Sequence, residues 1–230
     1  MSDKQSKKKK KQDITKEQAI AMLWEQGELS WKLNRVQKEL KKVVDNDTTK
    51  TSVVVVSRRI GKTYWLVIES LMQCLKHPNS VVKFVFPKAK DAKTNIIPVM
   101  RMVTEDCPDH IKPVFNTQDK IYNFQNGSQI QLAGSDGGGI DSIRGGFAHL
   151  CIVDEAGFVD DLKYAVRSVL SPTIRTTGGR IILASTPSKS PDHEFITEYM
   201  IPYKATQRFK IYTLYDNPNF TPEIVQEIIA

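Results

Sequence analysis

The chain has 230 residues, of which 40% are hydrophobic, so it is long and apolar enough to form one sizeable globular core. Its formal net charge of +7 favours an anionic partner, and its three cysteines are too far apart for a metal-binding pair, which fits a reducing compartment. No apolar run approaches the length of about 18 residues that a membrane span needs, and the start of the chain lacks a signal-peptide core. Composition therefore excludes membrane-spanning and secreted classes.

The N-terminal part of the chain divides into a charged tail and a helical segment. A run of lysines in residues 1–13 predicts a disordered, solvated tail rather than a binding groove. Across residues 14–50, apolar residues recur at helical spacing, with a break expected near Gly27. We expect this helical segment to pack beside the site predicted from the next motif.

A predicted strand over Ser52–Val56, with four consecutive valines, runs into a turn that ends in Gly-Lys-Thr. A nucleoside triphosphate needs inward-facing backbone N–H groups, the positive end of a helix dipole, a lysine at the β- and γ-phosphates and a hydroxyl on Mg²⁺. The candidate nucleotide-binding residues are Ser57, Arg58, Arg59, Ile60, Gly61, Lys62 and Thr63, and Thr63 is also a candidate Mg²⁺ ligand. The usual pattern has glycine at the position of Val56, so the motif alone also allows an ordinary strand–turn–helix with a solvated lysine.

Several elements separate this motif from the next one. The patterns predict, in chain order, a helix over 63–75, a strand over 81–86 and a helix over 91–103 that is kinked at Pro98. Residues 121–132 alternate around Asn-Gly, which predicts a β-hairpin. The glycine-rich stretch 134–139 predicts a flexible loop, which serves either as a plain linker or to deliver a functional residue.

A second apolar strand, 148–153, ends in the carboxylates Asp154 and Glu155. In P-loop NTPases an aspartate at this place holds Mg²⁺ together with the P-loop hydroxyl, and an adjacent glutamate orients and deprotonates the attacking water. We expect Asp154 to be the metal partner and Glu155 the catalytic base, with Lys62 as the phosphate-binding lysine. Taken alone, the pattern also fits a strand followed by an acidic loop.

A third strand over 180–184 places Ser185 and Thr186 at its end. Because open α/β sheets bind ligands at the carboxyl ends of their strands, these hydroxyls could face the γ-phosphate, although a simple turn closed by Pro187 is the alternative. The remaining patterns predict a helix over 161–170, a strand over 208–214 and a helix from 222 onward. The predicted fold class is α/β: a P-loop NTPase with a mostly parallel sheet, helices on both faces and an antiparallel hairpin.

In combination and order, these motifs resemble the ATPase domain of the large terminase subunit of tailed bacteriophages, a P-loop NTPase of the RecA-like (ASCE) class. The segments that carry the resemblance are Ser57–Thr63, Ile143–Gly145, Cys151–Ala156, Ala184–Pro187 and Tyr215–Pro218. The similarity extends from about Trp31 to Pro218. It implies an ATPase core over 51–218 that uses ATP and Mg²⁺.

The resemblance also implies roles for individual residues. Arg144 is similar to an arginine that terminases are thought to insert into the active site of a neighbouring subunit, where it stabilises charge on the transferring phosphoryl group. Arg58 is the competing candidate for an arginine acting in cis, and Arg144 could instead contact phosphate or DNA. Ser185 and Thr186 resemble the motif that couples hydrolysis to movement. Gln37 resembles an adenine-reading glutamine, although a glutamine on a charged helix is also common as plain surface.

The implied partners are those of a DNA-packaging motor. They are double-stranded DNA held through its phosphate backbone, a portal protein, a small terminase subunit and further copies of the chain in a homo-oligomeric ring. The implied location is the host bacterial cytoplasm, at the procapsid portal, with no membrane contact. Residues 219–230 resemble the start of a linker toward a C-terminal nuclease domain, and without that domain we expect no DNA cleavage.

Two other functions fit the same motifs. A helicase-like, nucleic-acid-dependent ATPase shares the core but needs a second RecA-like domain, for which the chain has no room. A non-catalytic nucleic-acid-binding module with a relic nucleotide site is suggested by Val56 and by the basic charge. The complete set Lys62, Thr63, Asp154 and Glu155 argues against it.

Overall fold

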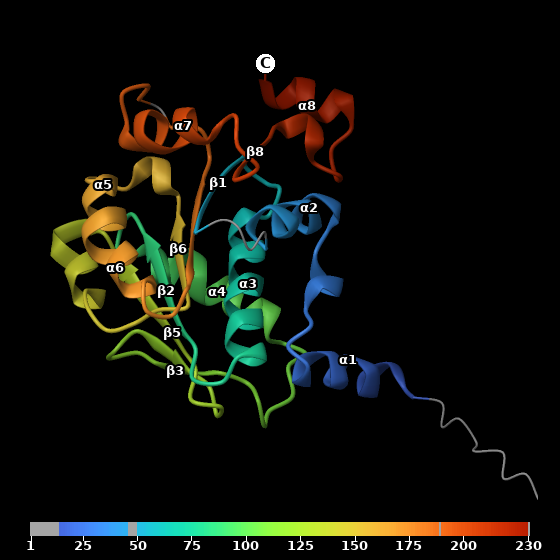
Figure 1. Ribbon diagram of the computed structural model, residues 1–230. Helices are drawn as coiled ribbons and strands as arrows, with labels where there is room; N and C mark the ends of the chain where they lie inside the picture. Colours follow the sequence, from blue (N-terminus) through green and yellow to red (C-terminus); the bar gives the residue numbers. More distant parts are fainter. Residues whose placement is uncertain (1–13, 46–49, 189, 230) are drawn as a thin grey trace, which may run out of the picture.

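The computed structural model describes residues 14–45, 50–188 and 190–229, so the tail predicted over residues 1–13 lies outside the described residues. Within the described part, eight strands form one sheet with helices on both faces (Figure 1). The strands are β1 (Thr51–Val56), β2 (Val81–Phe86), β3 (Val114–Asn116), β4 (Ile121–Asn123), β5 (Gln129–Gly134), β6 (Leu150–Asp154), β7 (Arg180–Ser185) and β8 (Phe209–Tyr212). The α-helices are α1 (Lys16–Glu25), α2 (Arg35–Val44), α3 (Lys62–Lys76), α4 (Ile97–Val103), α5 (Leu162–Tyr164), α6 (Ser171–Ile174), α7 (Ile201–Tyr203) and α8 (Pro222–Ile229).

The strand order is β3–β4–β5–β2–β6–β7–β1–β8. Neighbours from β5 to β8 are parallel, whereas β3, β4 and β5 pair antiparallel. The predicted mostly parallel sheet with an antiparallel addition is therefore confirmed. The parallel strands end at one edge of the sheet, here called the carboxyl edge, and they begin at the opposite amino edge. Strand β7 lies between β1 and β6, so the Gly-Lys-Thr turn after β1 and the carboxylates after β6 are separated by one strand.

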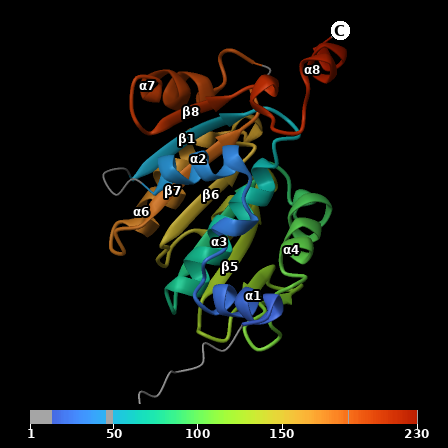
Figure 2. The ribbon, with the colours of Figure 1, turned by 90° about the vertical axis from the view of Figure 1, so that its right-hand side faces the viewer.

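The two faces of the sheet bury separate apolar cores. In β1, Val54 and Val56 face the core beneath α3, while Val53 and Val55 face the core beneath α5 and α6. A strand buried on both faces explains the uninterrupted run of valines, because β-branched side chains fit a pleated surface. Figure 2 shows α2, α3 and α4 on the face of the sheet to which Val54 and Val56 point.

The segment predicted as interrupted helix forms α1 and α2, and Gly27 lies between them with a φ of 64°. The hairpin predicted over 121–132 is confirmed as β4 and β5, and the late strand is confirmed as β8. The glycine-rich stretch predicted as a flexible loop instead folds into 3₁₀ turns over Asp136–Ile143. Gly137 and Gly138 take φ values of 56° and 75°, a left-handed conformation that lets the chain reverse between these turns.

Three π turns each lead into a short helix that contains a proline. They cover Ala92–Ile96, Ala165–Leu170 and Phe195–Met200, and the following helices α4, α6 and α7 carry a proline in their first turn. Proline has no N–H and its ring crowds the carbonyl four residues earlier, so a wider turn accommodates it. The interruption predicted at Pro98 is confirmed, and the same arrangement recurs at Pro172 and Pro202. None of the described helices combines the length and apolar character that crossing a membrane requires.

Candidate nucleotide site

The turn after β1 is shaped by two residues with left-handed backbone. Arg59 has a φ of 68° and Gly61 a φ of 87°, and Gly61 is the N-cap of α3. Glycine suits this conformation, and a Cβ added at Gly61 would lie 2.7 Å from Nε2 of Gln37, so the Gln37 side chain would have to move. The buried side chain of Ile60 anchors the turn to the core. The turn thus directs the N-terminus of α3 toward the carboxyl edge.

Lys62 and Thr63, at the start of α3, meet the carboxylates at the end of β6. The buried Lys62 Nζ forms an ion pair with Asp154 Oδ1 and lies 3.1 Å from Glu155 Oε1. Burial alone lowers the pKa of Lys62, but the charges of Asp154 and Glu155 outweigh it and raise the pKa, so the lysine stays charged. The Thr63 hydroxyl donates to Asp154 Oδ2 at 2.7 Å. These contacts unite the lysine, the hydroxyl and both carboxylates in one cluster.

Glu155 is held in place by the third strand. It is a non-glycine residue with a φ of 52°, which strains the backbone immediately after β6. Its Oε2 accepts from the Thr186 hydroxyl at 3.1 Å and from the Thr186 backbone N–H at 3.3 Å. The buried Ser185 Oγ accepts from the Gly157 N–H at 2.9 Å, which fixes the turn that follows Glu155. Ser185 and Thr186 therefore touch the predicted base and its loop directly.

Gln37 lies against the turn after β1, and its side-chain amide is hydrogen-bonded at both its nitrogen and its oxygen. Its Nε2 donates to the Gly61 carbonyl at 3.0 Å, and its Oε1 accepts from the Asn34 backbone N–H at 2.9 Å. Asn34 caps α2 and also donates to the Ile60 carbonyl at 3.4 Å. In this arrangement Gln37 braces the turn. Asn34 and Gln37, three residues apart, form a capping box, a sequence signal that could have indicated the start of α2 beside this turn.

The sequence analysis did not identify Asn217, a second residue that stabilises the turn after β1. Asn217 is buried, and its Nδ2 donates to the Arg59 carbonyl at 3.1 Å. The residue lies in the segment that carries the resemblance near Pro218, but its contact with Arg59 required the folded chain. The exit from the core is thereby joined to the left-handed residue of the phosphate-binding turn.

A hollow of about 700 Å³ opens beside Glu155 at the carboxyl edge. Its lining includes Arg58 and Thr186, together with Lys88, Lys90 and His193, which sequence reasoning did not select. The two lysines follow β2, whose neighbour in the sheet is β6, so the topology brings them to the acidic strand end. The three basic side chains of this hollow are matched by the carboxylates of Asp91, Glu155 and Asp160, so the lining offers groups of both charges beside the Lys62 cluster.

Arg144 lies apart from this cluster. Within the described part of the chain, its side chain is 59% exposed, contacts the Tyr164 hydroxyl at 3.3 Å and lies 3.8 Å from Asp141 Oδ1. The Tyr164 hydroxyl donates to Asp141 at 2.7 Å, so the three side chains form a surface group. The structure therefore brings Lys62, Thr63, Asp154, Glu155, Ser185, Thr186, Gln37 and Arg58 to one edge, and it leaves Arg144 on the flank.

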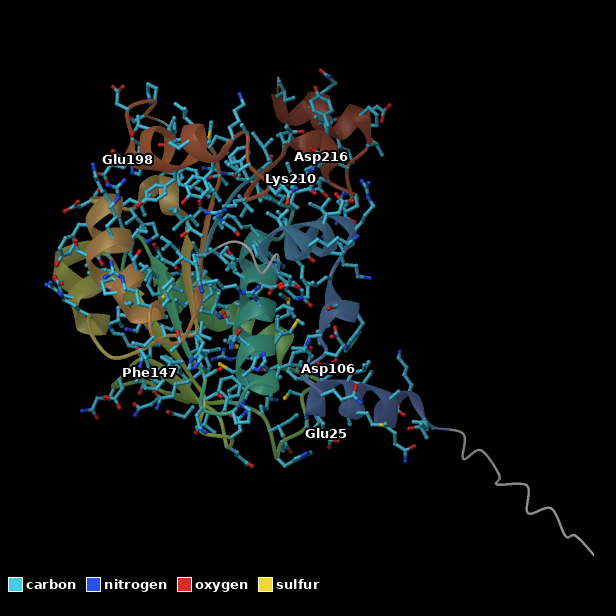
Figure 3. The ribbon with its side chains drawn as sticks, in the orientation of Figure 1. Glu25, Asp106, Phe147, Glu198, Lys210 and Asp216 are labelled. Atoms are coloured by element: carbon cyan, nitrogen blue, oxygen red, sulfur yellow. The ribbon has the colours of Figure 1, made fainter. Side chains whose placement is uncertain are left out.

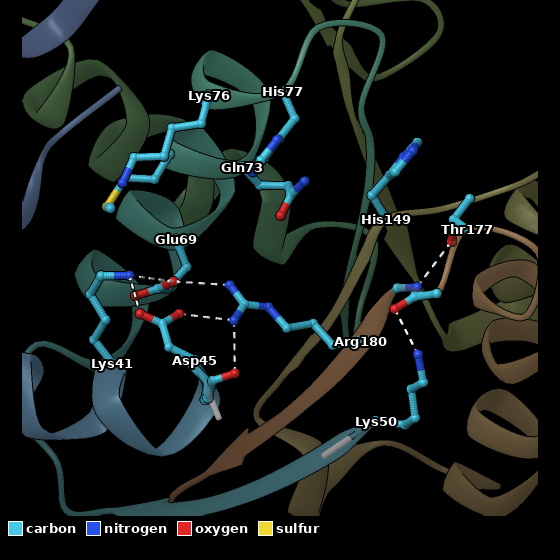
Figure 4. Close-up of a pocket in the computed structure, with 14 residues that line it drawn as sticks. Lys41, Asp45, Lys50, Glu69, Gln73, Lys76, His77, His149, Thr177 and Arg180 are labelled. Atoms are coloured by element: carbon cyan, nitrogen blue, oxygen red, sulfur yellow. Dashed lines mark hydrogen bonds and ion pairs between the residues drawn. The ribbon is translucent and has the colours of Figure 1, made fainter. Parts of the chain in front are cut away.

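A second hollow, of about 420 Å³, lies at the amino edge between α2, α3 and β7 (Figure 4). Arg180 lies 2.9 Å from Asp45 and 3.6 Å from the buried Glu69, and Lys41 lies 2.6 Å and 3.8 Å from the same two carboxylates. Burial raises the pKa of Glu69 against the opposing effect of Lys41 and Arg180. The described residues that line this amino-edge hollow include none of the predicted site residues.

The residues at the carboxyl edge fit a Mg²⁺–nucleotide. The hydroxyl of Thr63 and the carboxylate of Asp154 are hard oxygen ligands of the kind Mg²⁺ takes, and they already lie 2.7 Å apart. The glycine turn presents the N-terminus of α3, where backbone N–H groups and the helix dipole attract phosphate. Lys62 supplies a buried positive charge at the same point.

Comparison with known proteins identifies the family. A family model described as the N-terminal part of the T4likevirus-type terminase large subunit matches residues 53–230. The chain belongs to this terminase family. No curated protein matches the terminase chain significantly.

Solved structures with the same fold include terminases and a helicase. The large terminase of a thermophilic bacteriophage matches with a TM-score of 0.64 and 14% identity, covering 94% of this chain and 50% of that one. The large terminase ATPase domain of Thermus phage P74-26 matches with a TM-score of 0.52 and 18% identity, covering 67% and 65%. The Hef helicase domain of Pyrococcus furiosus matches with a TM-score of 0.53 and 12% identity, covering 85% and 40%. The chain described here spans about half the length of the first of these proteins.

Proposed function

We propose that this terminase domain hydrolyses ATP with Mg²⁺ and that hydrolysis drives double-stranded DNA into a procapsid. The observation that carries the proposal is the meeting of Lys62, Thr63, Asp154 and Glu155 at the carboxyl edge. These side chains provide the phosphate ligand, the metal ligands and the base that phosphoryl transfer to water requires.

Each residue of the cluster has a defined task. Lys62 binds the β- and γ-phosphates, and Thr63 with Asp154 holds Mg²⁺, which neutralises phosphate charge when it is bound. Glu155 accepts a proton from the attacking water. In the structure Lys62 lies 3.1 Å from Glu155 Oε1, so a triphosphate that draws Lys62 away frees this oxygen for water. Thr186 keeps the other oxygen in place.

The remaining predicted residues have supporting roles. Arg58 lines the hollow beside Glu155 and is placed to act in cis. Arg144 is exposed on the flank, and its proposed task is to enter the site of a neighbouring subunit in a homo-oligomeric ring. Ser185 and Thr186 transmit the state of Glu155 to β7 and so couple hydrolysis to movement. Gln37 positions the turn, and adenine recognition is assigned to it on the resemblance alone.

The comparisons support nucleotide use. Solved structures of the large terminase from the thermophilic bacteriophage hold ADP and ATP-γ-S, and the chain matches them over 85% of its length. As partners we propose double-stranded DNA, a portal protein and a small terminase subunit, with the host cytoplasm as the location, because a packaging motor of this family works with them. A helicase-like ATPase remains the second candidate, since the Hef helicase domain shares the fold.

The proposal is tested by measuring ATP hydrolysis with Mg²⁺ against protein concentration, with Lys62→Ala as the inactive control. We expect wild-type activity per subunit to rise with concentration, because an arginine supplied by a neighbour acts only in assemblies. Stimulation by single-stranded but not double-stranded DNA would favour the helicase-like reading. Hydrolysis no faster than that of Lys62→Ala at every concentration would contradict the proposal and favour a binding module with a relic site.

A further inference from the structure

A buried lysine interrupts one apolar face of the central strand β2. Val85 on the same face packs in the core beneath α5 and α6, whereas Lys83 places a cation there with only 2% of the residue exposed. In register, Lys83 lies between Gln131 of β5 and Cys151 of β6. A hydrophobic residue is the ordinary occupant of such a position, because burying a charge is costly unless it is well hydrogen-bonded.

The partners of this lysine are two carbonyls that flank Arg144. Lys83 Nζ donates to the Ile143 carbonyl at 2.7 Å and to the Gly145 carbonyl at 2.7 Å. The ion pairs found among the described residues do not include Lys83, so these backbone oxygens are what compensates its charge. Desolvation lowers the pKa of Lys83, and the carbonyls provide the acceptors that the buried ammonium needs.

The loop around Arg144 depends on such an anchor. Gly145 and Gly146 have φ values of 85° and 61°, and a Cβ at either position would meet no atom within 4 Å. Two glycines in open space give the backbone wide conformational freedom. Phe147, just after them, lies on the surface at the opposite end of the molecule from Glu198 and Lys210 (Figure 3).

Among the described residues, the side chain of Arg144 is held by surface contacts. Asp141 lies 3.8 Å away, and the Tyr164 hydroxyl accepts from Arg144 at 3.3 Å. Such exposed pairs contribute little by themselves. Beneath the surface, Lys83 contacts the loop carbonyls, and the side chain of Ile143 packs in the core next to them.

We propose that Lys83 is a positioning residue that fixes the Arg144 loop by holding the carbonyls on both sides of the arginine. Its effect on hydrolysis rests on the proposed function of Arg144. Its effect on the loop does not.

The test compares Lys83→Met, which keeps length and apolar surface but removes the donors, with wild type. Trypsin cleaves after arginine, so the initial rate of cleavage at Arg144–Gly145, followed by mass spectrometry, reports opening of the loop. We expect cleavage to be about tenfold faster or more, because two hydrogen bonds from a charged donor are lost. We expect turnover to fall roughly 100-fold with ATP-γ-S affinity unchanged, since a displaced catalytic group loses its alignment.

Two variants separate positioning from general destabilisation. Val85→Ala removes core volume from the same face of β2 but leaves the loop contacts, so cleavage after Arg144 should stay at the wild-type rate. Lys83→Arg keeps a charged donor and should restore part of the protection. Equal cleavage after Arg144 in Lys83→Met and wild type, or equally fast cleavage in Val85→Ala, would overturn the proposal.

Different results would reject the positioning of the loop by Lys83 and the role of Arg144 in hydrolysis. A loosened loop with unchanged turnover in both Lys83→Met and Arg144→Ala would retain the positioning role and reject the catalytic role of Arg144. If Lys83→Met does not fold, NMR of the wild-type lysine ammonium groups decides. A slowly exchanging Lys83 ammonium supports the anchor, and exchange as fast as that of surface lysines contradicts it.

Discussion

The two charged clusters at opposite edges of the sheet contain the same kinds of side chain but differ in their backbone and surroundings. At the amino edge, Arg180, Asp45 and Glu69 join β7, α2 and α3, and all three sit on or next to regular elements (Figure 4). At the carboxyl edge, Asp154 and Glu155 meet Lys62 across a strained turn, with Glu155 in left-handed backbone. Left-handed backbone at a non-glycine residue costs about 1–3 kcal/mol, and such strain collects at functional sites.

The difference shows that ion pairs alone do not mark a catalytic site in this fold. The cluster at the amino edge also lines a hollow, but its ion pairs tie three regular elements together. The cluster at the carboxyl edge borders a hollow lined by side chains of both charges and sits at the strand ends, where α/β sheets bind ligands. Changes at the two edges should therefore separate into effects on turnover and effects on stability.

The largest effect on turnover is expected for Arg144→Ala. Loss of an arginine finger lowers the rate by about 10³–10⁵-fold, while nucleotide binding persists because Arg144 lies outside the Lys62 cluster. Arg167→Ala, another exposed arginine, is the matched control and should retain activity. Mixing Arg144→Ala with Lys62→Ala protein should recover part of the activity, since each supplies what the other lacks. Mixed assemblies that form, as judged by crosslinking, but stay inactive would reject a role in trans and favour Arg58 in cis.

A smaller effect is expected for Thr186→Val. The change removes the hydroxyl that holds Glu155 at 3.1 Å but keeps the side-chain shape and the backbone donor. Loss of one hydrogen bond to a charged group should lower kcat about tenfold and leave ATP-γ-S affinity unchanged. Thr197→Val, an exposed change of the same kind, should have no effect. A fall in affinity without a fall in kcat would mean that Thr186 binds nucleotide instead of positioning the base.

The smallest effect on turnover is expected at the amino edge. Arg180→Ala leaves Glu69 buried with Lys41 at 3.8 Å as its remaining cation, so the free energy of unfolding should fall by about 3 kcal/mol. ATP turnover per folded molecule should stay at the wild-type level. Lys50→Ala, which removes a surface contact to the Gly178 carbonyl, should change stability by less than about 0.5 kcal/mol. Urea titration measures the change in stability, and ATPase assays on the same variants measure turnover. Lost turnover in folded Arg180→Ala would contradict the separation of stability at the amino edge from turnover at the carboxyl edge.

The fold could be predicted because its strands and helices carry strong local patterns. The valine run of β1 and the alternation around Asn126 and Gly127 determine local structure without help from distant residues. The order of strands could not be predicted, since nothing in β1 or β6 indicates that β7 lies between them. The glycine-rich stretch was predicted as a flexible loop but forms 3₁₀ turns, which its composition alone does not indicate.

The main groups of the site could be predicted, but not what supports them. Lys62, Asp154 and Glu155 stand at strand and helix ends, where their chemistry follows from position. Asn217 and Lys83 act through backbone carbonyls that come close only in the folded chain. A single lysine within the apolar run 81–86 was the one sign of the second contact.

Glu155→Gln tests the central claim most directly. The amide cannot accept the proton of the attacking water, while Lys62, Thr63 and Asp154 remain to bind Mg²⁺–ATP. Binding of ATP-γ-S and steady-state hydrolysis should be measured on the same preparation. We expect wild-type affinity with turnover reduced by about 10²–10⁴-fold. Near-normal turnover in Glu155→Gln would show that Glu155 is not the base and would contradict the assignment of the carboxyl edge as the catalytic site.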